Sequence, residues 1–293
     1  KKEMLDFNQM LDAGVHFGHL KRKWNPKMAP YIFMERNGIH IIDLHKTAAK
    51  AEEAAAALRQ ISKSGKKILF VATKKQAKDI VAERVRSTNM PYVTERWPGG
   101  MLTNFVTIRK AVKKMNTLEK LLSDKDSTTI SKRERLQITR EKAKLEKNLG
   151  SIADLSRLPS ALFVVDINKE HIAIAEAKRL NIPTFAMVDT NCDPNLVDFA
   201  IPANDDASKS VALIVDYICK AIEEGAQERK MDKDSRAAEQ NEEENEEMAS
   251  EHLDTEEAEE NEGNKIRKVK GSTEDNMEKR PRKQIAKRNV SKK

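Results

Sequence analysis

The sequence contains little of what secreted, membrane-spanning or disulfide-rich proteins need. Its 293 residues include two cysteines, Cys192 and Cys219, which are too few for a disulfide framework or a zinc cluster. No apolar run is long enough to cross a bilayer, and the first residues carry no signal-peptide apolar region. We therefore expect a cytoplasmic protein in a reducing compartment.

Aromatic residues are also scarce, at 4% of the chain, whereas charged residues make up 34%. This composition is too polar for one compact globule, so part of the chain is expected to lie outside a core. Residues 239–262 hold thirteen acids and no Lys or Arg, and residues 264–293 hold twelve Lys and Arg against three acids. We predict a disordered tail over residues 227–293, acidic first and then basic.

The net charge of +7 is unevenly distributed along the chain. Residues 1–225 carry a net charge of +10, and residues 226–293 carry −3. A basic folded part suits a polyanionic partner such as a nucleic acid. The plainer alternative is a basic protein whose charges are merely solvated.

From residue 38 to residue 226, apolar strands alternate with helices, apart from one interruption. We expect strands at 39–44, 67–73, 92–95, 161–166, 184–189 and 199–201, and helices at about 45–65, 75–87, 169–180 and 205–224. This alternation predicts an α/β fold, in which helices cover both faces of a parallel sheet. We assign residues 1–102 and 153–226 to this α/β domain.

Residues 103–152 interrupt the alternation. Two runs of apolar residues spaced three or four apart are separated by the polar stretch 123–132. The pattern predicts an inserted, protruding coiled-coil α-hairpin, and a helix pair folded flat on the sheet is the alternative. The outer faces are basic, and we predict that four cations of the first arm contact RNA: Arg109, Lys110, Lys113 and Lys114.

Two further cation-rich stretches each contain a tryptophan, "HFGHLKRKWNPKMAPYIF" (16–33) and "ERWPGGMLTN" (95–104). Lys and Arg neutralise phosphates, and a tryptophan ring can stack on an exposed base. Burial in the core is an equally weighted alternative for either tryptophan. The RNA-binding residues that we predict here are Lys21, Arg22, Lys23, Trp24, Lys27, Arg96 and Trp97.

The motifs of nucleotide-binding and nucleophilic enzymes are missing from the sequence. There is no GxGxxG and no GxxxxGK[ST], and the strand at 67–73 is followed by "KKQAKD". A helix start near Lys74 and Lys75 could still hold one phosphate through its backbone N–H groups. There is no GxSxG, and neither cysteine has a histidine beside it in sequence. We expect no catalytic residues and no cofactor.

A metal site is the third chemical possibility. His16 and His19 have a spacing that suits one face of a helical turn, and further ligands would have to come from Asp189, Cys192 or Asp193. Lone histidines more often pack or form hydrogen bonds, so we expect no metal. We also expect "VDTNCDP" (188–194) to be a structural loop in which Asp and Asn side chains bind backbone N–H groups.

Four motifs in order carry a family resemblance: "AGVHFGHLKRKWNPKMAPYIFMERNGIHIIDLHKT" (13–47), "RWPGGMLTN" (96–104), "VDTNCDP" (188–194) and "IPANDDA" (201–207). Over about residues 3–226 the chain resembles the bacterial family of the second protein of the small ribosomal subunit. The resemblance implies a flavodoxin-like domain with a protruding coiled-coil hairpin, and no catalytic activity. It also implies binding to small-subunit rRNA between head and body, and recruitment of the mRNA-binding first protein of the subunit.

Two other functions stay open from the residues alone. One is a doubly wound enzyme that acts on a phosphorylated ligand through Lys74, and the other is an adaptor that binds proteins through the hairpin and the acidic tail.

Overall fold

The computed structural model describes residues 5–123 and 131–236 of the chain. The chain divides into two units, Lys1–Asp232 and Lys233–Lys293, and the fold described below belongs to the first. Most of the predicted tail lies outside the described residues, so its disorder stays a prediction, as do the domain boundaries. No helix in the described ranges is both long and apolar enough to span a membrane.

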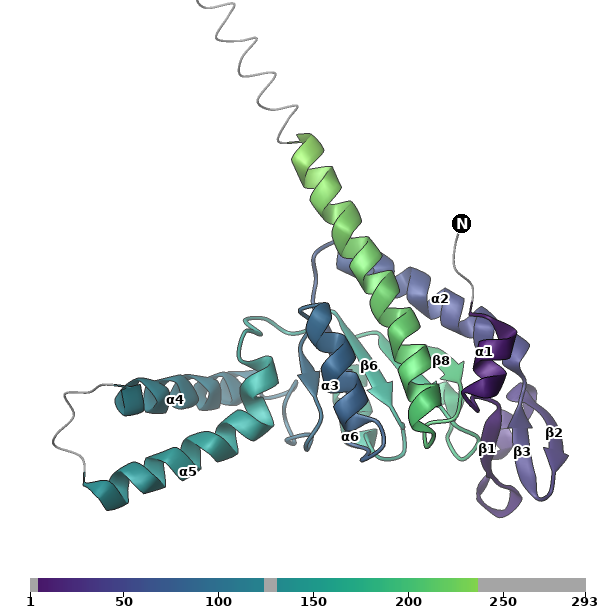
Figure 1. Ribbon diagram of the computed structural model, residues 1–293, viewed down its shortest axis with the longest axis horizontal. Helices are drawn as coiled ribbons and strands as arrows, with labels where there is room; N and C mark the ends of the chain where they lie inside the picture. Colours follow the sequence, from purple (N-terminus) through teal and green to yellow (C-terminus); the bar gives the residue numbers. More distant parts are fainter. Residues whose placement is uncertain (1–4, 124–130, 237–293) are drawn as a thin grey trace, which may run out of the picture. The chain divides into compact units, whose positions relative to one another are not determined.

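Five parallel strands form the centre of the first unit and confirm the predicted α/β fold (Figure 1). Their order in the sheet is β5-β4-β6-β7-β8, which is the flavodoxin-like order. Every residue of β4, β6 and β7 is buried, as expected for parallel strands that are covered on both faces. The bounds are β4 (Ile68–Val71), β5 (Tyr92–Val93), β6 (Ala161–Val165), β7 (Thr184–Val188) and β8 (Phe199–Pro202).

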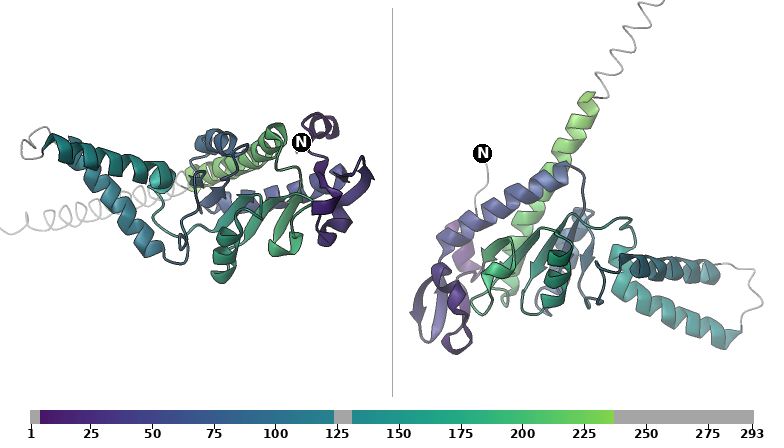
Figure 2. Two further views of the ribbon diagram at one scale, coloured as in Figure 1. Left: turned by 90° about the horizontal axis from the view of Figure 1, so that it is seen from below. Right: turned by 180° about the vertical axis from the view of Figure 1, so that it is seen from behind.

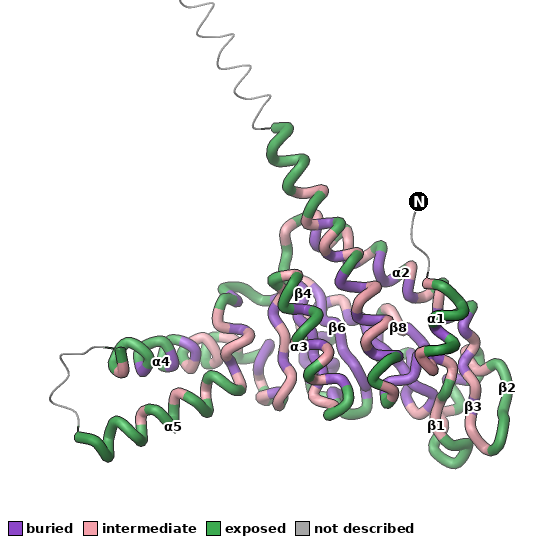
Figure 3. The backbone as a smooth tube through the Cα atoms, in the orientation of Figure 1, coloured by how far each residue is buried: buried purple, intermediate pink, exposed green. Residues whose placement is uncertain are grey.

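Helices pack on both faces of this sheet. On one face, α2, α3 and an unlabelled helix at 208–236 contact a layer that includes Phe70 and Phe163. On the other face, α6 and the base of the 103–152 segment contact Leu69 and Leu162. Figure 3 shows the buried strands between the two layers. The helix bounds are α2 (Leu44–Lys63), α3 (Lys78–Ser87) and α6 (His171–Arg179).

The two long helices differ from their predicted limits for local reasons. The Asp43 carboxylate caps α2 by accepting the N–H of His45, and the chain leaves this helix at Gly65, whose φ of +74° favours glycine. The last helix continues to residue 236, past residue 227 where we expected the tail to begin.

A small antiparallel sheet precedes α2, and the sequence analysis did not predict it. Its order is β1-β3-β2, so the strand expected at 39–44 pairs with neighbours in this sheet and not with the parallel one. Asn37 and Gly38 both have positive φ and form the tight turn between β2 and β3. The bounds are α1 (Phe7–Asp12), β1 (Phe17–Leu20), β2 (Ile32–Arg36) and β3 (Ile39–Ile42).

The 103–152 segment contains two helices, as predicted. In both views of Figure 2, α4 (Phe105–Ser123) lies beside α5 (Lys132–Leu149). The Lys142 Nζ atom of α5 is 2.9 Å from the Glu119 Oε1 atom of α4, and Met115 and Leu118 are buried. That the two helices form a coiled coil stays a prediction.

Candidate nucleic-acid interface

The cations that follow β1 lie on a short 3₁₀ turn, η1 (Lys21–Lys23), whose three side chains are exposed. The backbone N–H of Lys21 donates to the Gly38 carbonyl at 2.9 Å, which ties this turn to the small sheet. The Lys21 Nζ atom is 2.7 Å from the Glu35 carboxylate. Arg22 and Lys23 have no ion-pair partner within residues 5–123 and 131–236, so their charges are open to solvent.

Trp24 and Lys27 contact the protein more closely than these cations. The Trp24 ring is half-buried against His40, with ring centroids 4.9 Å apart and planes at 45°. The Lys27 Nζ atom lies 2.6 Å from the Asp193 carboxylate, and this hydrogen bond lowers the pKa of Asp193. Lys27 therefore fastens the N-terminal segment to the 188–194 loop.

Arg96 and Trp97 are adjacent in sequence but lie in different environments. Arg96 is exposed, and no ion-pair partner for it occurs among the residues that the structure describes. Trp97 is only 7% exposed, and its indole N–H donates to the Glu176 carboxylate at 3.1 Å. This position agrees with the core alternative for Trp97, because a buried and hydrogen-bonded ring is not open to stack on a base.

The four predicted cations of α4 also separate into two kinds. The Arg109 guanidinium donates to the Leu155 carbonyl at 2.9 Å, and Lys114 pairs with Glu141 of α5. Lys110 and Lys113 are exposed, and in the described part of the chain neither has an ion-pair partner. Of the four predicted cations, Lys110 and Lys113 are therefore the two whose charge is free for an outside partner.

Lys74, which we had considered as a phosphate ligand, binds carboxylates of the protein itself. Its Nζ atom is 2.8 Å from Asp205, 2.6 Å from Asp206 and 3.6 Å from Asp166, all at the carboxyl ends of the parallel strands. Burial alone would lower the pKa of Lys74, but Asp205, then Asp206 and Asp166, outweigh it and raise the pKa. The Lys74 side chain is therefore occupied by carboxylates of the protein, and α3 begins at Lys78, three residues after the start that we expected near Lys75.

Asp205 is the most deeply buried member of this cluster, with an exposed fraction of 0%. Its Oδ2 atom has no hydrogen-bond partner in the described residues. Burial and then the neighbouring charge of Asp189 raise the pKa of Asp205, against the opposing effect of Lys74. The sequence signals for this cluster were the polar residues that follow β4 and β8, namely Lys74 and "NDD" (204–206), but nothing in the sequence showed that they meet.

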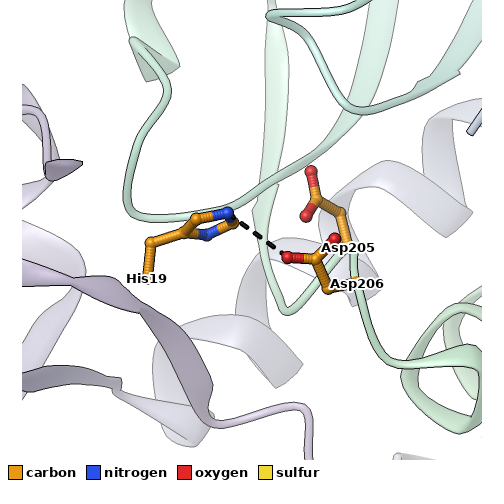
Figure 4. A group of neighbouring side chains, drawn as sticks. All are labelled: His19, Asp205 and Asp206. Atoms are coloured by element: carbon orange, nitrogen blue, oxygen red, sulfur yellow. Dashed lines mark ion pairs between the residues drawn. The ribbon is translucent and has the colours of Figure 1, made fainter.

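His19 joins the same cluster from the N-terminal sheet (Figure 4). It lies on strand β1 and not on a helix, with Nδ1 3.1 Å from Asp189 and Nε2 3.3 Å from Asp206. The hydrogen bond with Asp189 raises the pKa of His19, while partial burial opposes this effect. The backbone N–H of His19 donates to the Thr190 hydroxyl at 2.7 Å, and the Asp189 and Asp193 side chains accept the backbone N–H groups of Thr190 and Asn195, as predicted for the 188–194 loop.

One imidazole and two carboxylates of this cluster are arranged so that they could converge on a cation. The ligand atoms of His19, Asp205 and Asp206 all lie within 4.8 Å of one another, a donor set that suits Zn²⁺. In this structure the single Lys74 ammonium is ion-paired with both aspartates. The ligand set also differs from the sequence hypothesis: His16 packs on Phe17, and burial raises the pKa of Cys192 to about 12, which disfavours a metal-binding thiolate.

Comparison with known proteins shows which family the chain matches. A family model described as ribosomal protein S2 matches residues 10–225. A relative from Phocaeicola vulgatus, named small ribosomal subunit protein uS2, is 71% identical over 237 residues, which cover 80% of this chain and 85% of the relative. A relative of the same name from Flavobacterium johnsoniae is 66% identical over 236 residues, 80% of this chain and 93% of the relative.

Proposed function

The chain belongs to the ribosomal protein S2 family, and from this premise we propose that it binds small-subunit rRNA through its exposed cations. As a member of this family it is a structural, non-enzymatic constituent of the small ribosomal subunit. Its place in the ribosome also supports the cytoplasmic location that we expected from the sequence.

The observation that carries the RNA proposal is the difference between free and occupied cations. Exposed Lys and Arg side chains gain binding free energy by displacing counterions from phosphates, whereas a cation held by a carboxylate would first have to break its ion pair. We propose Arg22, Lys23, Arg96, Lys110 and Lys113 as the main contacts. Lys21, Lys27, Arg109 and Lys114 already have protein partners and are proposed as weaker contacts.

The tryptophans have different places in this proposal. Trp24 is half-buried beside the η1 cations, and we propose that its free edge contacts a base or a ribose. Trp97 is expected to stabilise its own loop, through the hydrogen bond that its indole N–H donates to Glu176. Recognition is expected to depend on RNA shape and backbone, because no sequence-reading module was found in the chain's sequence.

The experiment that tests this function is sedimentation of a cell extract on a sucrose gradient, with and without nuclease. We expect the chain to migrate with the small subunit and to leave that position after nuclease treatment. A free peak in untreated extract would contradict stable attachment to the subunit. Association that persists after complete digestion of the RNA would favour the adaptor function, in which proteins provide the contacts.

A second proposed function is to dock the mRNA-binding first protein of the subunit. An apolar groove of about 630 Å³ lies between α1 and the small sheet, and exposed apolar surface of this kind is typical of protein interaction sites. Five large apolar side chains that line it are between 44% and 70% exposed: Phe7, Leu11, Phe17, Phe33 and Met34.

Binding of the purified first protein to this chain tests the docking proposal. We expect Phe33→Ser to weaken the complex, because Phe33 is 70% exposed beside the groove. Leu158→Ser is the matched control, since Leu158 is also exposed but does not line the groove. Equal loss of affinity in both variants would contradict docking at this surface.

A further inference from the structure

One carboxylate, that of Glu176, accepts hydrogen bonds from much of the 97–103 loop, which joins the α/β domain to α4. Glu176 of α6 is only 8% exposed, and no cation within hydrogen-bond distance balances its charge in the described structure. Five donors surround it instead. They are Trp97 Nε1 at 3.1 Å and the Gly100 N–H at 2.8 Å on Oε1, and the Leu102 N–H at 2.9 Å, the Thr103 N–H at 3.0 Å and the Thr103 hydroxyl at 3.2 Å on Oε2.

This arrangement keeps Glu176 ionised inside the protein. Burial alone would raise the pKa of Glu176, but the hydrogen bonds from Thr103, Trp97 and the backbone outweigh it and lower the pKa. Backbone N–H groups that point inward are otherwise costly to bury, so the carboxylate and the loop stabilise each other. Gly100, with a φ of +81°, allows the chain to turn so that the N–H groups of Gly100, Leu102 and Thr103 face the carboxylate.

The same loop carries Arg96 at one end and leads into α4 at the other. Arg96 is exposed immediately before Trp97, and α4 begins at Phe105, two residues after Thr103. The contacts with Glu176 therefore fix both the residue after Arg96 and the residues before the basic helix. A side chain held in one place loses less conformational entropy when it binds a partner.

We propose that Glu176 is a positioning residue for RNA binding: its carboxylate holds the 97–103 loop so that Arg96 is presented to rRNA phosphate. This inference rests on the proposed RNA-binding function and names a residue of opposite charge that the function requires. Glu176 itself does not touch the RNA, and it acts through the hydrogen bonds that it accepts.

A double-mutant cycle on RNA binding tests the proposal. The variants Glu176→Gln, Arg96→Gln and the double variant are titrated with small-subunit rRNA at several salt concentrations. Gln keeps the size of the side chain but replaces one carboxylate oxygen by an NH₂ group, which cannot accept hydrogen bonds. Two donors lose their acceptor if the NH₂ group takes the place of Oε1, and three if it takes the place of Oε2. Each single variant is expected to lose roughly eightfold in affinity near 0.1 M salt and about one unit of salt slope, the share of one phosphate contact. The double variant should lose little more than Glu176→Gln alone.

The control variant is Glu170→Gln, which alters another buried carboxylate at the start of the same helix. Glu170 accepts hydrogen bonds from Thr73 and does not contact the 97–103 loop. It should leave the salt slope unchanged, because it removes no acceptor of the 97–103 loop. If Glu176→Gln does not fold, Thr103→Val removes only the hydroxyl donor and is expected to give a smaller loss in the same direction.

The outcomes separate the inference from the function on which it rests. Folded Glu176→Gln or Thr103→Val protein with the affinity and salt slope of the wild type would overturn the positioning role of Glu176. Fully additive losses in the double variant would overturn it as well, because Arg96 would then act independently of Glu176. Wild-type binding that does not change with salt would instead overturn the proposed RNA-binding function.

Discussion

The chain contains two groups of cations, one held by carboxylates of the protein and one without such partners in the described residues. Lys74, at the carboxyl ends of the parallel strands, is 13% exposed and lies within 3.6 Å of three aspartates. Arg22 and Lys23 on η1 are exposed and have no carboxylate partner in the described residues. The first group stabilises the fold, and the second is open to an outside polyanion. The edge of the sheet where a doubly wound enzyme would bind its ligand is thus filled by the protein's own charges.

The largest expected effect comes from removing the cation of the buried group. Lys74→Met keeps the apolar stem but leaves Asp205 and Asp206 without their ammonium partner. We expect the free energy of unfolding to fall by roughly 3 kcal/mol, because Asp205 then becomes an unpaired buried carboxylate, whereas Asp206 is exposed. Urea unfolding measures this loss. Rescue by the triple variant Lys74→Met/Asp205→Asn/Asp206→Asn is the control, and a Lys74→Met protein as stable as the wild type would contradict the role of Lys74.

Neutralising the exposed cations should lower RNA affinity and leave the free energy of unfolding almost unchanged. Arg22→Gln/Lys23→Gln is expected to weaken binding to small-subunit rRNA by roughly 50-fold near 0.1 M salt, the share of two phosphate contacts. Stability should stay within about 0.5 kcal/mol of the wild type, because these side chains are exposed. Filter binding and urea unfolding give the two quantities. Loss of stability without loss of affinity would reverse the comparison between the two groups.

Two adjacent lysines of α4 allow a more direct comparison of a free cation with a paired one. Lys113 is exposed without a partner in the described residues, whereas its neighbour Lys114 pairs with Glu141. We expect Lys113→Gln to lose roughly eightfold in RNA affinity and Lys114→Gln less than about threefold. The two variants differ by one position on the same helix and so control for each other. Equal losses would show that internal ion pairing does not decide which cations bind RNA.

The smallest expected effect is a pH dependence at the edge of the buried group. The pKa of His19 is raised above its ordinary value of 6.5, chiefly by the hydrogen bond with Asp189. The folded state therefore binds the proton more tightly, and the stability from this contact is full below pH 6.5 and is lost as pH rises through the folded-state pKa. We expect His19→Gln to cost roughly 1 kcal/mol at low pH and less at high pH.

Urea midpoints of the wild type and of His19→Gln, measured from below pH 6.5 to above the folded-state pKa of His19, give this effect. His171→Gln is the exposed-histidine control. A stability difference between wild type and His19→Gln that grows with pH would contradict the direction of the shift.

Much of the fold could be predicted because it depends on short-range patterns. The apolar runs at 67–73, 161–166 and 184–189 became β4, β6 and β7, and the two runs with helical spacing became α4 and α5. The antiparallel sheet was missed because its strands are short and separated by turns that contain Pro26 and Pro30. The Asn37–Gly38 dipeptide was the available signal for its hairpin.

The candidate site was less predictable because it depends on which distant residues meet. Composition showed an excess of positive charge but could not show that Lys74 meets Asp205, 131 residues away, while Arg22 meets no carboxylate in the described chain. The same limit applies to Trp97, which follows the charged residues Glu95 and Arg96 in sequence but whose ring is buried and donates a hydrogen bond to Glu176 of α6. Local sequence therefore indicated the kind of partner, and only the fold separated free cations from occupied ones.

The salt dependence of RNA binding tests the central claim most directly. The purified wild type and the variant Arg22→Gln/Lys23→Gln/Lys110→Gln/Lys113→Gln are titrated with small-subunit rRNA from about 50 to about 300 mM salt. We predict a linear fall of log affinity with log salt for the wild type, and a slope shallower by about 3 to 4 units for the variant, with unchanged unfolding. Equal slopes for the two proteins would contradict the claim that these free cations bind the RNA.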